Sequence, residues 1–383
     1  MIMTLGSVCT FLNGGTPSRS VARYFEGDVP WITGADIVGP TVDRARGFIT
    51  EEAIRDSATN HVPTETVLLV TRTSVGKVAI AGMPLCFSQD ITAITPDPKR
   101  LNTGYLVHFL RTKQSYLERA ARGATIKGVT REVVANIPVA LPPLPEQRRI
   151  AEVLDRADAL RAKRRAALAQ VDTLTQAIFL DMFGDPVTNK KAYPVYQMGD
   201  VCDVRDGTHD SPKYGSEGGY PLVTSKNVSG GFIDLTDVNY ISEADYIQIN
   251  KRSKVDRGDI IMPMIGTIGS PVLVDHEPRY AIKNLALVKF TERSPSAIFV
   301  HHLLNCHYFD HIVSQKNRGG TQKFVSLGDL RAFPLPLPPQ KEQQEFAYCV
   351  EAVDKVRTIN QASLAELDAL FASLQYRAFR GEL

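Results

Sequence analysis

Apolar residues recur at alternating steps of four and three along two long stretches of the chain. The first stretch opens at Pro145 and reaches about Met182 without a further proline or glycine. Its seam is Val153, Ala157, Leu160, Arg164, Ala167, Val171, Leu174 and Ile178. The seam of the second stretch is Cys349, Val353, Val356, Asn360, Ser363, Leu367, Leu370 and Leu374. This spacing of about 3.5 residues indicates coiled-coil helices. The alternative is an amphipathic helix that lies on its own domain.

Outside these stretches, short apolar runs alternate with turn residues, which is typical of β-strands. Val67–Val70 and Val78–Ile80 precede the first long helix, and Ile260–Met262 and Val272–Val274 follow it. Helical patterns interrupt the strands at Leu106–Arg119 and Ile298–Val313. The pattern predicts an α+β fold with four segments. These are a mixed domain at 1–142, a central spacer helix at 143–187, a second mixed domain at 188–338 and a C-terminal spacer helix at 339–383.

The chain also repeats itself, at an offset that drifts from 193 to 196 residues. Leu5–Cys9 corresponds to Met198–Cys202, and Pro142–Gln147 corresponds to Pro338–Gln343. A repeat this long is a duplicated domain, because solenoid units recur every few dozen residues. The duplication predicts two similar domains related by a pseudo-twofold axis.

The order of the segments predicts the direction of the two helices. If the ends of the second domain lie close together, as is common, the first helix ends where the second begins. The helices then pair as an antiparallel coiled coil, with Arg164 near Asn360 at its centre. A polar residue in an apolar seam fixes the register at some cost in stability. About 38 residues at 1.5 Å each would form a rod of roughly 55 Å with one domain at each end.

Composition adds little beyond this picture. The net charge is +2 over 383 residues, and the apolar and charged fractions are those of an ordinary soluble protein. No apolar run of about 18 residues occurs, so we expect no membrane span. The N-terminus shows no secretory pattern, and we expect a cytoplasmic protein. Five scattered cysteines without a CxxC pair indicate reduced thiols in the core.

No motif predicts catalysis. Gly76-Lys77-Val78 is similar to the end of a phosphate loop, but Thr71 stands at the first glycine position and Val78 at the Ser/Thr position. The densest group of potential metal ligands is His301, His302, Cys306, His307 and His311. Only His302 has a histidine counterpart in the repeat, His108. No flanking carboxylate would accept a hydrogen bond from a metal-bound histidine. We therefore expect a binding protein without catalytic residues or a metal.

Four pairs of repeat-equivalent loops share a frame but differ in side chains, and loops on a rigid frame commonly carry recognition residues. Small residues in these loops allow close backbone approach, and the others supply hydrogen-bond donors. The candidate contact residues of the first domain are Thr16, Ser18, Arg19, Thr33, Asp36, Arg72, Thr73, Ser74, Lys77, Lys127 and Arg131. Those of the second domain are Thr208, His209, Lys213, Tyr214, Thr224, Ser225, Lys226, Asn227, Thr267, Arg318, Thr321, Gln322 and Lys323. For the loops at 13–20 and 206–214, a solvated turn is the alternative.

Several short motifs in this chain occur in a known order. They are Gly14–Ser18, Trp31–Asp36, Ile49–Ala53, Leu141–Arg148, Asp206–His209 and Phe379–Leu383. In this order, and duplicated, they resemble the specificity subunit of type I restriction–modification systems over the whole chain. Each motif is short, so their order and duplication make the resemblance specific.

The resemblance implies that each mixed domain is a target recognition domain for one half of an asymmetric, interrupted site on double-stranded DNA. It implies that the helices set the spacing between the half-sites and dock two methyltransferase subunits. Whether two restriction subunits also join stays open. S-adenosylmethionine, ATP and magnesium would belong to the partner subunits, so the chain itself would need no cofactor.

Base-contacting residues do not follow from the resemblance, although Arg or Lys can read guanine, Asn or Gln adenine, and Asp or Glu cytosine. Two other interpretations of the chain remain. One is a bivalent protein-binding scaffold without DNA specificity, and the other is an enzyme of unrecognised type.

Overall fold

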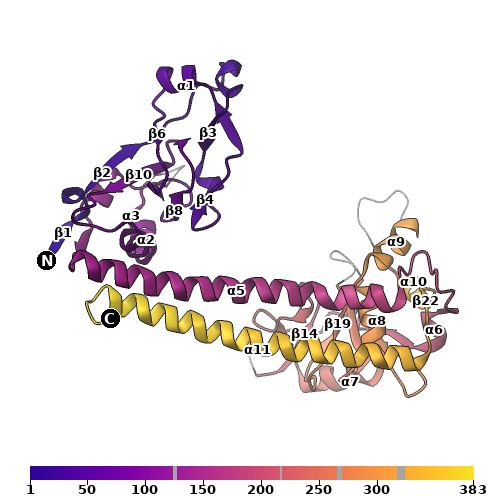
Figure 1. Cartoon of the computed structure of the whole chain (residues 1–383). Coiled ribbons are helices and arrows are strands. Elements are labelled where there is room, and N and C mark those ends of the chain that lie inside the picture. Colours follow the sequence, from indigo (N-terminus) through magenta and orange to yellow (C-terminus); the bar gives the residue numbers. More distant parts are fainter. Residues whose placement is uncertain (124–126, 216–217, 265–269, 317–323) are drawn as a thin grey trace. The chain divides into compact units, whose positions relative to one another are not determined.

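The computed structural model describes residues 1–123, 127–215, 218–264, 270–316 and 324–383. Its contacts divide the chain into two compact units (Figure 1). Unit 1 consists of Met1–Arg165 and Ala362–Leu383, and unit 2 consists of Ala166–Gln361. Each unit therefore combines one mixed domain with part of each long helix. Among the described residues, no helix has both the length and the apolar character needed to cross a membrane.

Unit 1 contains a five-stranded sheet in the order β2-β10-β7-β8-β4 and a four-stranded sheet in the order β5-β3-β9-β6. The larger sheet is formed by β2 (Cys9–Asn13), β4 (Thr41–Val42), β7 (Val67–Val70), β8 (Val78–Ala81) and β10 (Ile91–Pro96). The smaller sheet is formed by β3 (Val29–Ile32), β5 (Gly47–Ile49), β6 (His61–Val62) and β9 (Leu85–Phe87). β1 (Ile2–Thr4) pairs antiparallel with β11 (Pro138–Ala140), so the two ends of the first domain meet. The two strands predicted here are confirmed as β7 and β8.

Short helices pack around the two sheets of unit 1. They are η1 (Leu5–Ser7), η2 (Ala22–Phe25), η3 (Gly34–Asp36), α1 (Glu51–Asp56), α2 (Thr103–Thr112), α3 (Gln114–Ala120) and α4 (Arg131–Ala135). Of these, α2 packs against the larger sheet and η2 against the smaller one. The single helix predicted at Leu106–Arg119 is divided at Lys113, whose N–H bonds to the carbonyl of Leu110. This tighter turn ends α2 and changes the direction of the chain before α3.

Unit 2 repeats the plan of unit 1. Its sheets have the orders β13-β21-β18-β19 and β17-β14-β20. The strands are β13 (Asp203–Asp206), β14 (Tyr220–Val223), β17 (Asn239–Ile241), β18 (Ile260–Pro263), β19 (Val272–Leu273), β20 (Ala281–Ile282) and β21 (Leu285–Lys289). A hairpin joins β15 (Val228–Ser229) to β16 (Phe232–Ile233). β12 (Val195–Gln197) pairs with β22 (Pro334–Pro336), so the ends of the second domain also meet, as predicted.

The described short helices of unit 2 correspond to those of unit 1 except η2. They are α6 (Met198–Val201), η4 (Ser225–Asn227), α7 (Glu243–Ser253), α8 (Ala297–Leu304), α9 (His307–Lys316) and α10 (Leu327–Arg331). As in unit 1, the helix predicted at Ile298–Val313 is divided into two.

The two long helices are α5 (Leu144–Phe183) and α11 (Gln340–Ala378), and both are continuous. In unit 1 the early part of α5 lies against the late part of α11, since Arg149 donates to the carbonyl of Leu383 and Arg161 pairs with Asp368. In unit 2 the late part of α5 lies against the early part of α11, where Asp172 pairs with Arg357. The predicted antiparallel pairing is confirmed within each unit.

Four of the sixteen predicted seam residues are wrong by one position. The period of 3.5 holds, but Leu160, Leu174, Val356 and Leu370 are 53, 44, 47 and 51% exposed. The inward positions are their following neighbours, Arg161, Thr175, Arg357 and Phe371, none of which is exposed. Two seams with steps of three and four can share every second position and differ by one residue at the others. At these four differing positions the outward-facing residue is apolar, so the sequence pattern favoured the wrong one of the two seams.

Two inward arginines join the helices through repeat-equivalent ion pairs. Arg161 bonds Asp158 on its own helix and Asp368 on α11, at 2.8 and 2.6 Å. In unit 2, Arg357 bonds Asp354 on its own helix and Asp172 on α5. Each guanidinium thus bridges two helices, which fixes how they are aligned along their length.

The two polar residues predicted at the centre of the seam, Arg164 and Asn360, belong to different units. Asn360 is buried in unit 2 and donates to the carbonyl of Val356 at 2.7 Å. Arg164 belongs to unit 1. Their meeting at the centre of the coiled coil stays a prediction.

A buried glutamine attaches the start of each long helix to its domain. The side chain of Gln147 accepts from the N–H of Asn102 and donates to the carbonyls of Arg100 and Pro142, all at 2.8–2.9 Å. Gln343 accepts from the N–H of Ser296 and donates to the carbonyl of Pro338. The Pro-Pro-x-x-x-Gln motif therefore positions the helix, because one amide serves both a donor and an acceptor that burial would otherwise leave unpaired.

Thr175 marks a difference between the units. Its counterpart in unit 1, Phe371, lies under the Arg161 guanidinium at 4.2 Å. Thr175 lines a pocket of about 790 Å³, yet its own hydroxyl is buried and has no hydrogen-bond partner among the described residues.

We expect Thr175→Val to raise the free energy of unfolding by about 1 kcal/mol, because it removes a buried hydroxyl without changing the shape of the side chain. Thr173→Val on the same helix is the matched control, since the Thr173 hydroxyl is exposed and bonded to Gln170. Chemical denaturation of the full chain measures both. A loss of stability at Thr175 larger than that of the control would contradict the assignment.

Candidate nucleic-acid interface

In unit 1 the predicted loops converge on one turn, Ser88–Asp90, which joins β9 to β10. The N–H groups of Gly14 and Gly15 bond to the carbonyls at either side of this turn, Ile91 and Phe87. A Cβ at Gly14 would lie 2.1 Å from the carbonyl oxygen of Ser88, so only glycine permits this approach. The loop at 13–20 is therefore packed onto the turn at its start.

Two further loops meet the same turn. The N–H groups of Thr71 and Arg72 both bond to the carbonyl of Asp90, and the N–H of Ser88 bonds to the carbonyl of Ile32. Gly34 faces Asp90 and the Thr73 hydroxyl, each 3.8 Å from where its Cβ would stand. Loops that are 20 to 60 residues apart in the sequence thus form one surface.

The fourth loop is joined to this surface through its backbone. Thr73 adopts a left-handed conformation (φ 64°), and its N–H bonds to the carbonyl of Lys127 at 3.2 Å. Gly128 forms bridges with Arg72 and Arg122. Arg72, Arg122 and Lys127 are all exposed, so three cations project from one backbone-linked pair of loops.

The remaining candidates of unit 1 differ in how free their side chains are. Thr16, Ser18, Arg19, Ser74, Lys77 and Arg131 are exposed, and Arg131 lies over the Phe11 ring at 5.7 Å. Asp36 instead accepts from the N–H and hydroxyl of Thr33 and pairs with Arg46. Burial alone would raise the pKa of Asp36, but these bonds outweigh it and lower the pKa. Thr33 and Asp36 therefore stabilise the conformation of their loop.

Unit 2 forms an equivalent surface around the turn Lys283–Asn284, between β20 and β21. The N–H groups of Gly207 and Thr208 bond to Leu285 and Ile282, and the N–H of Asn284 bonds back to Thr208. The N–H of Lys283 bonds to Val223, as that of Ser88 does to Ile32. Asn284 is left-handed (φ 54°), a conformation that Asn tolerates better than most residues.

In this second surface, a network of hydrogen bonds and ion pairs holds the loop that begins at Asp206. His209 lies between Asp206 and Asn284, with Nε2 at 2.7 Å from Asp206 and Nδ1 at 2.8 Å from Asn284. Arg252 pairs with the other oxygen of Asp206, which is buried. Lys283 donates to the hydroxyl of Ser211 at 2.6 Å. Lys213 and Tyr214 follow and are exposed.

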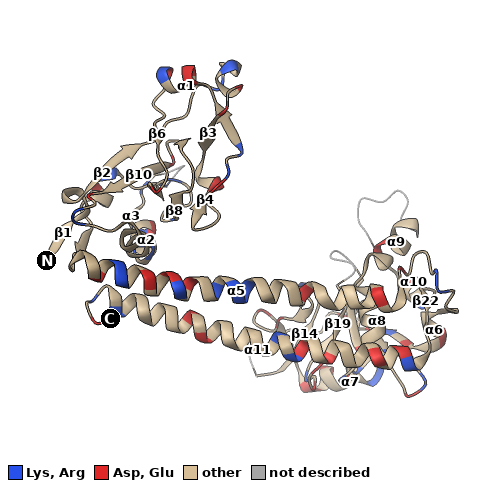
Figure 2. Cartoon of the chain, viewed as in Figure 1, with Lys and Arg blue, Asp and Glu red and all other residues tan. Residues whose placement is uncertain are grey.

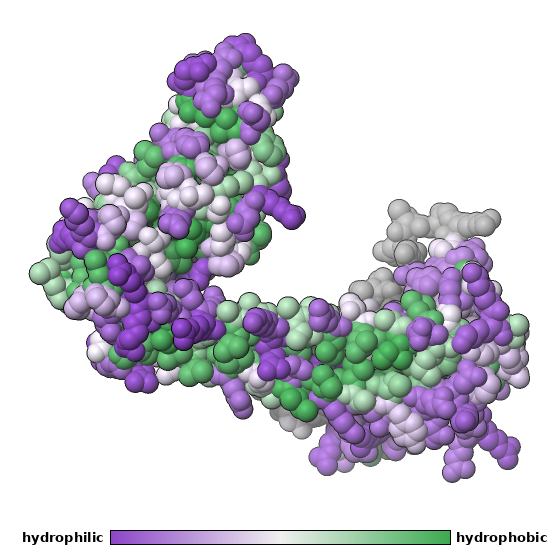
Figure 3. All heavy atoms as spheres, in the orientation of Figure 1, coloured by the Kyte–Doolittle hydropathy of each residue, from purple (hydrophilic) through white to green (hydrophobic). Residues whose placement is uncertain are grey.

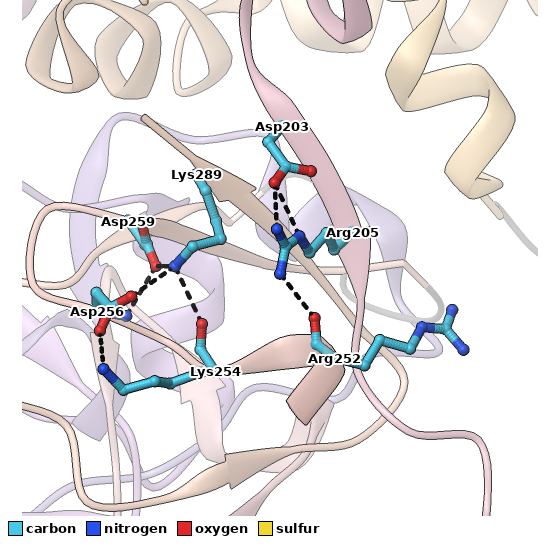
Figure 4. Close-up of polar contacts among 7 residues, drawn as sticks. All are labelled: Asp203, Arg205, Arg252, Lys254, Asp256, Asp259 and Lys289. Atoms are coloured by element: carbon cyan, nitrogen blue, oxygen red, sulfur yellow. Dashed lines mark hydrogen bonds and ion pairs between the residues drawn. The ribbon is translucent and has the colours of Figure 1, made fainter. Parts of the chain in front are cut away.

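A second set of ion pairs holds the end of α7, which carries Arg252. Figure 4 shows Arg205 paired with Asp203 and donating to the backbone carbonyl of Arg252 at 3.0 Å. Lys289 donates to Asp256, Asp259 and the carbonyl of Lys254. Burial raises the pKa of Asp259, and the hydrogen bond from Lys289 opposes this. The network fixes the backbone from which the Arg252 side chain reaches Asp206.

The other candidates of unit 2 divide into three groups. Ser225 and Lys226 are exposed, and Lys226 lies 3.6 Å from Asp237. Thr224 and buried Asn227 form a capping box like that of Thr33 and Asp36, and they shape their loop in the same way. Thr267, Arg318, Thr321, Gln322 and Lys323 lie outside the described residues.

The histidine-rich segment does not gather around one point. His301 bonds to the carbonyl of Pro271, His307 to Asp185 and His311 to Gln315. Burial lowers the pKa of His302 to about 3, so this ring is neutral. No group of three potential metal ligands occurs among the described residues. The five cysteines are free, and burial raises the pKa of the Cys9 and Cys202 thiols to about 12.

Sequence reasoning missed Ser88, Asp90, Lys283 and Asn284, which lie at the centres of the two surfaces. Their importance depends on which strands pair, and strand pairing is not a local property. Asn284 between two apolar strands was the one local signal, since Asn favours tight turns. Figure 2 shows Lys and Arg interspersed with Asp and Glu in both units.

The geometry of two equivalent loop surfaces on a duplicated frame agrees with the match to known proteins. The model of the type I restriction modification DNA specificity domain matches residues 1–170 and 190–369. The chain belongs to this family. The domain is matched twice, so the internal repeat is a duplication of the specificity domain, and membership supports a role in DNA sequence specificity.

Two similar proteins cover nearly the whole chain, and a third covers part of it. The specificity subunit of the type I restriction enzyme MjaIX from Methanocaldococcus jannaschii is 26% identical over 396 residues, covering 97% of this chain and 90% of the relative. The EcoKI specificity subunit from Escherichia coli strain K12 is 25% identical, covering 100 and 89%. The EcoR124I/EcoR124II subunit from Escherichia coli is 32% identical over 164 residues, 41% of this chain and 40% of the relative.

Solved structures share the fold. The type I restriction–modification S subunit from M. genitalium aligns with a TM-score of 0.61 at 16% identity, covering 99% of this chain and 96% of that one. A chain from a structure on complex assembly and conformational transition of the type I system aligns with a TM-score of 0.62 at 20% identity, covering 100 and 98%. The arrangement of two specificity domains with two long helices is thus the fold of this family.

Proposed function

We propose that this specificity-family chain recognises an asymmetric, bipartite DNA site, with one half-site bound by each unit. The observation that carries the proposal is the equivalence of the two loop surfaces. The same backbone bonds hold the turns at Ser88–Asp90 and Lys283–Asn284, but the side chains presented there differ. One frame with two sets of donors and acceptors is suited to two different base sequences.

The side chains present in each surface support this proposal. Unit 1 offers Arg72, Arg122 and Lys127 beside the hydroxyls of Thr73 and Ser74. Arginine can donate to both acceptors of guanine in the major groove, and lysine and hydroxyls also contact phosphates. Unit 2 offers Lys213, Tyr214 and Lys226 instead. In this proposal the helices set the spacing between the half-sites.

We also propose that the long helices dock two methyltransferase subunits. The outward residues Leu160 and Leu370 flank the Arg161–Asp368 pair in unit 1. Their repeat equivalents, Val356 and Leu174, flank the Arg357–Asp172 pair in unit 2. Figure 3 shows apolar surface over α5 and α11 in unit 2. Two equivalent apolar patches on one chain favour two copies of the same partner.

The chemistry of modification and cleavage belongs, in this proposal, to the partner subunits. S-adenosylmethionine would be bound by the methyltransferase, and ATP and magnesium by a restriction subunit where one joins. The chain would then contribute recognition and assembly and no catalytic residue. Its similarity to a chain from a structure on complex assembly of the type I system supports the assembly role.

Arg72→Ala and Lys127→Ala test the half-site assignment. We expect each to weaken binding of the methyltransferase complex to its mapped site by about 1–3 kcal/mol if a base contact is lost. The loss should change base preference within one half-site only. Binding to duplexes with single base changes across both half-sites measures this. Unchanged affinity for both variants would remove these loops from the interface.

Apolar-to-Asp substitutions test the docking patches. We expect Leu160→Asp with Leu370→Asp to reduce the methyltransferase stoichiometry from two to one, as measured by native mass spectrometry. Leu174→Asp with Val356→Asp should do the same, and all four together should abolish assembly. Ala169→Asp with Ala365→Asp is the control, because these exposed, repeat-equivalent alanines stand nine residues from Leu160 and Val356, about half a turn round the helix. Two bound copies in the fourfold variant would contradict the proposal.

A further inference from the structure

The two loop surfaces differ in the side-chain contacts that hold their first loop, 13–20 in unit 1 and 206–215 in unit 2. In unit 1 the loop at 13–20 is held by neutral groups. Asn60 donates to the carbonyl of Asn13 at 2.8 Å, and Trp31 donates to the carbonyl of Gly15 at 3.2 Å. In unit 2 the equivalent loop, 206–215, is held by the ring of His209 between Asp206 and Asn284. The two loops are held by equivalent backbone hydrogen bonds but by different side-chain hydrogen bonds.

The geometry at His209 suits a charged ring. Both ring nitrogens face oxygen atoms, the carboxylate of Asp206 and the amide oxygen of Asn284. A neutral imidazole has one N–H and can donate only once, whereas an imidazolium can donate to both oxygens. With the Asn284 oxygen toward Nδ1, the protonated ring makes both bonds and the neutral ring makes one of them.

The bonds of His209 control where the rest of the loop lies. Asp206 ends β13, Asn284 belongs to the central turn, and His209 stands one residue after the backbone anchor at Thr208. Beyond His209, the Ser211 hydroxyl accepts from Lys283, and the next backbone bond of the loop is that of Gly215 to Tyr240. Lys213 and Tyr214 lie between these points and are exposed.

We infer that His209 is a positioning residue for the half-site bound by unit 2, whose imidazolium fastens the loop that presents Lys213 and Tyr214. This inference rests on the proposed function and deepens it, because it makes recognition of one half-site depend on a proton that the other half-site does not need. The charged groups that face the ring are Asp206 from β13 and Arg252 from α7.

The surroundings of His209 favour the charged form. The hydrogen bonds to Asn284 and then to Asp206 raise the pKa of His209, while partial burial and the charge of Arg252 oppose the shift. A group with a raised pKa gives its full contribution below its ordinary value of about 6.5 and loses it as pH rises through the shifted value. The loop of unit 2 is therefore held by this contact below the ordinary pKa of histidine and loses it as pH rises through the raised pKa.

The test uses the full chain in complex with its methyltransferase, on duplexes that contain the mapped site with single base changes. The Arg72→Ala and Lys127→Ala variants identify the half-site of unit 1, and the other half-site belongs to unit 2. We expect His209→Ala to reduce discrimination at several base pairs of the unit 2 half-site by roughly tenfold, comparable to one lost base contact. Discrimination in the unit 1 half-site should not change. His276→Ala, at an exposed histidine of the same unit, is the control.

A pH series separates positioning from a structural role of any other kind. In the wild-type complex, discrimination at the unit 2 half-site should fall as pH rises from 6 to 9, and His209→Ala should show no such fall. Asn284→Asp should move the midpoint to higher pH, since a carboxylate holds the ring proton more tightly than an amide does. An unchanged midpoint in Asn284→Asp would overturn the inference.

Salt dependence separates positioning from direct contact with DNA. If His209 contacts a phosphate, its removal lowers the slope of log affinity against log salt by about one. If it reads a base, only one base pair loses discrimination. Either result, or equal losses in both half-sites, would overturn the inference while leaving the proposed function intact. A wild-type complex without any mapped site would instead overturn the proposed function.

Discussion

Each globular core is completed by two helix segments that come from opposite ends of the long helices, and the rest of the structure depends on this constraint. The core of unit 1 contains Ile150 and Leu154 from the start of α5, and Phe371 and Ala378 from the end of α11. The core of unit 2 contains Phe346 and Val350 from the start of α11, and Phe179 and Phe183 from the end of α5. A helix that left its domain would expose these apolar side chains to water, at a cost of roughly 1.5–3 kcal/mol for each large one. The same burial therefore holds each domain and sets the antiparallel direction of the helices.

This arrangement leaves the loops free to differ between the units. The frame that supports them consists of buried strands and backbone hydrogen bonds around the turns Ser88–Asp90 and Lys283–Asn284, and none of these bonds requires a particular exposed side chain. Unit 1 can therefore present Arg72 and Lys127, while unit 2 uses His209 and Asp206 to hold a different loop. Duplication of a specificity domain gives two loop surfaces of similar geometry, and substitution in the loops makes them chemically distinct.

Much of the fold could be predicted from the sequence, because its signals are periodic and repeated. The helices, their direction, the duplicated domain and strands such as Val67–Val70 follow from local patterns. The inward face of the helices could not be predicted, because apolar Leu160 and Leu174 point outward while charged Arg161 points inward. Arg161 is stabilised there by Asp368 and the Phe371 ring, partners about 200 residues away that no local pattern reveals. The candidate site was predicted as separate loops, and their convergence depends on the pairing of β9 and β10 with distant strands. Asp36 and Asn227 were chosen for their chemistry, and the structure shows them engaged in capping boxes.

The central claim is that this chain determines which DNA sequence a modification complex recognises. The most direct measurement is to coexpress the chain with its neighbouring methyltransferase subunit and to map modified bases across the host genome by long-read sequencing. The account predicts one split, asymmetric motif that appears only when this chain is present, with two specific halves separated by unspecified base pairs. An assembled complex that leaves the genome unmodified, or a motif that is unchanged without this chain, would contradict the account.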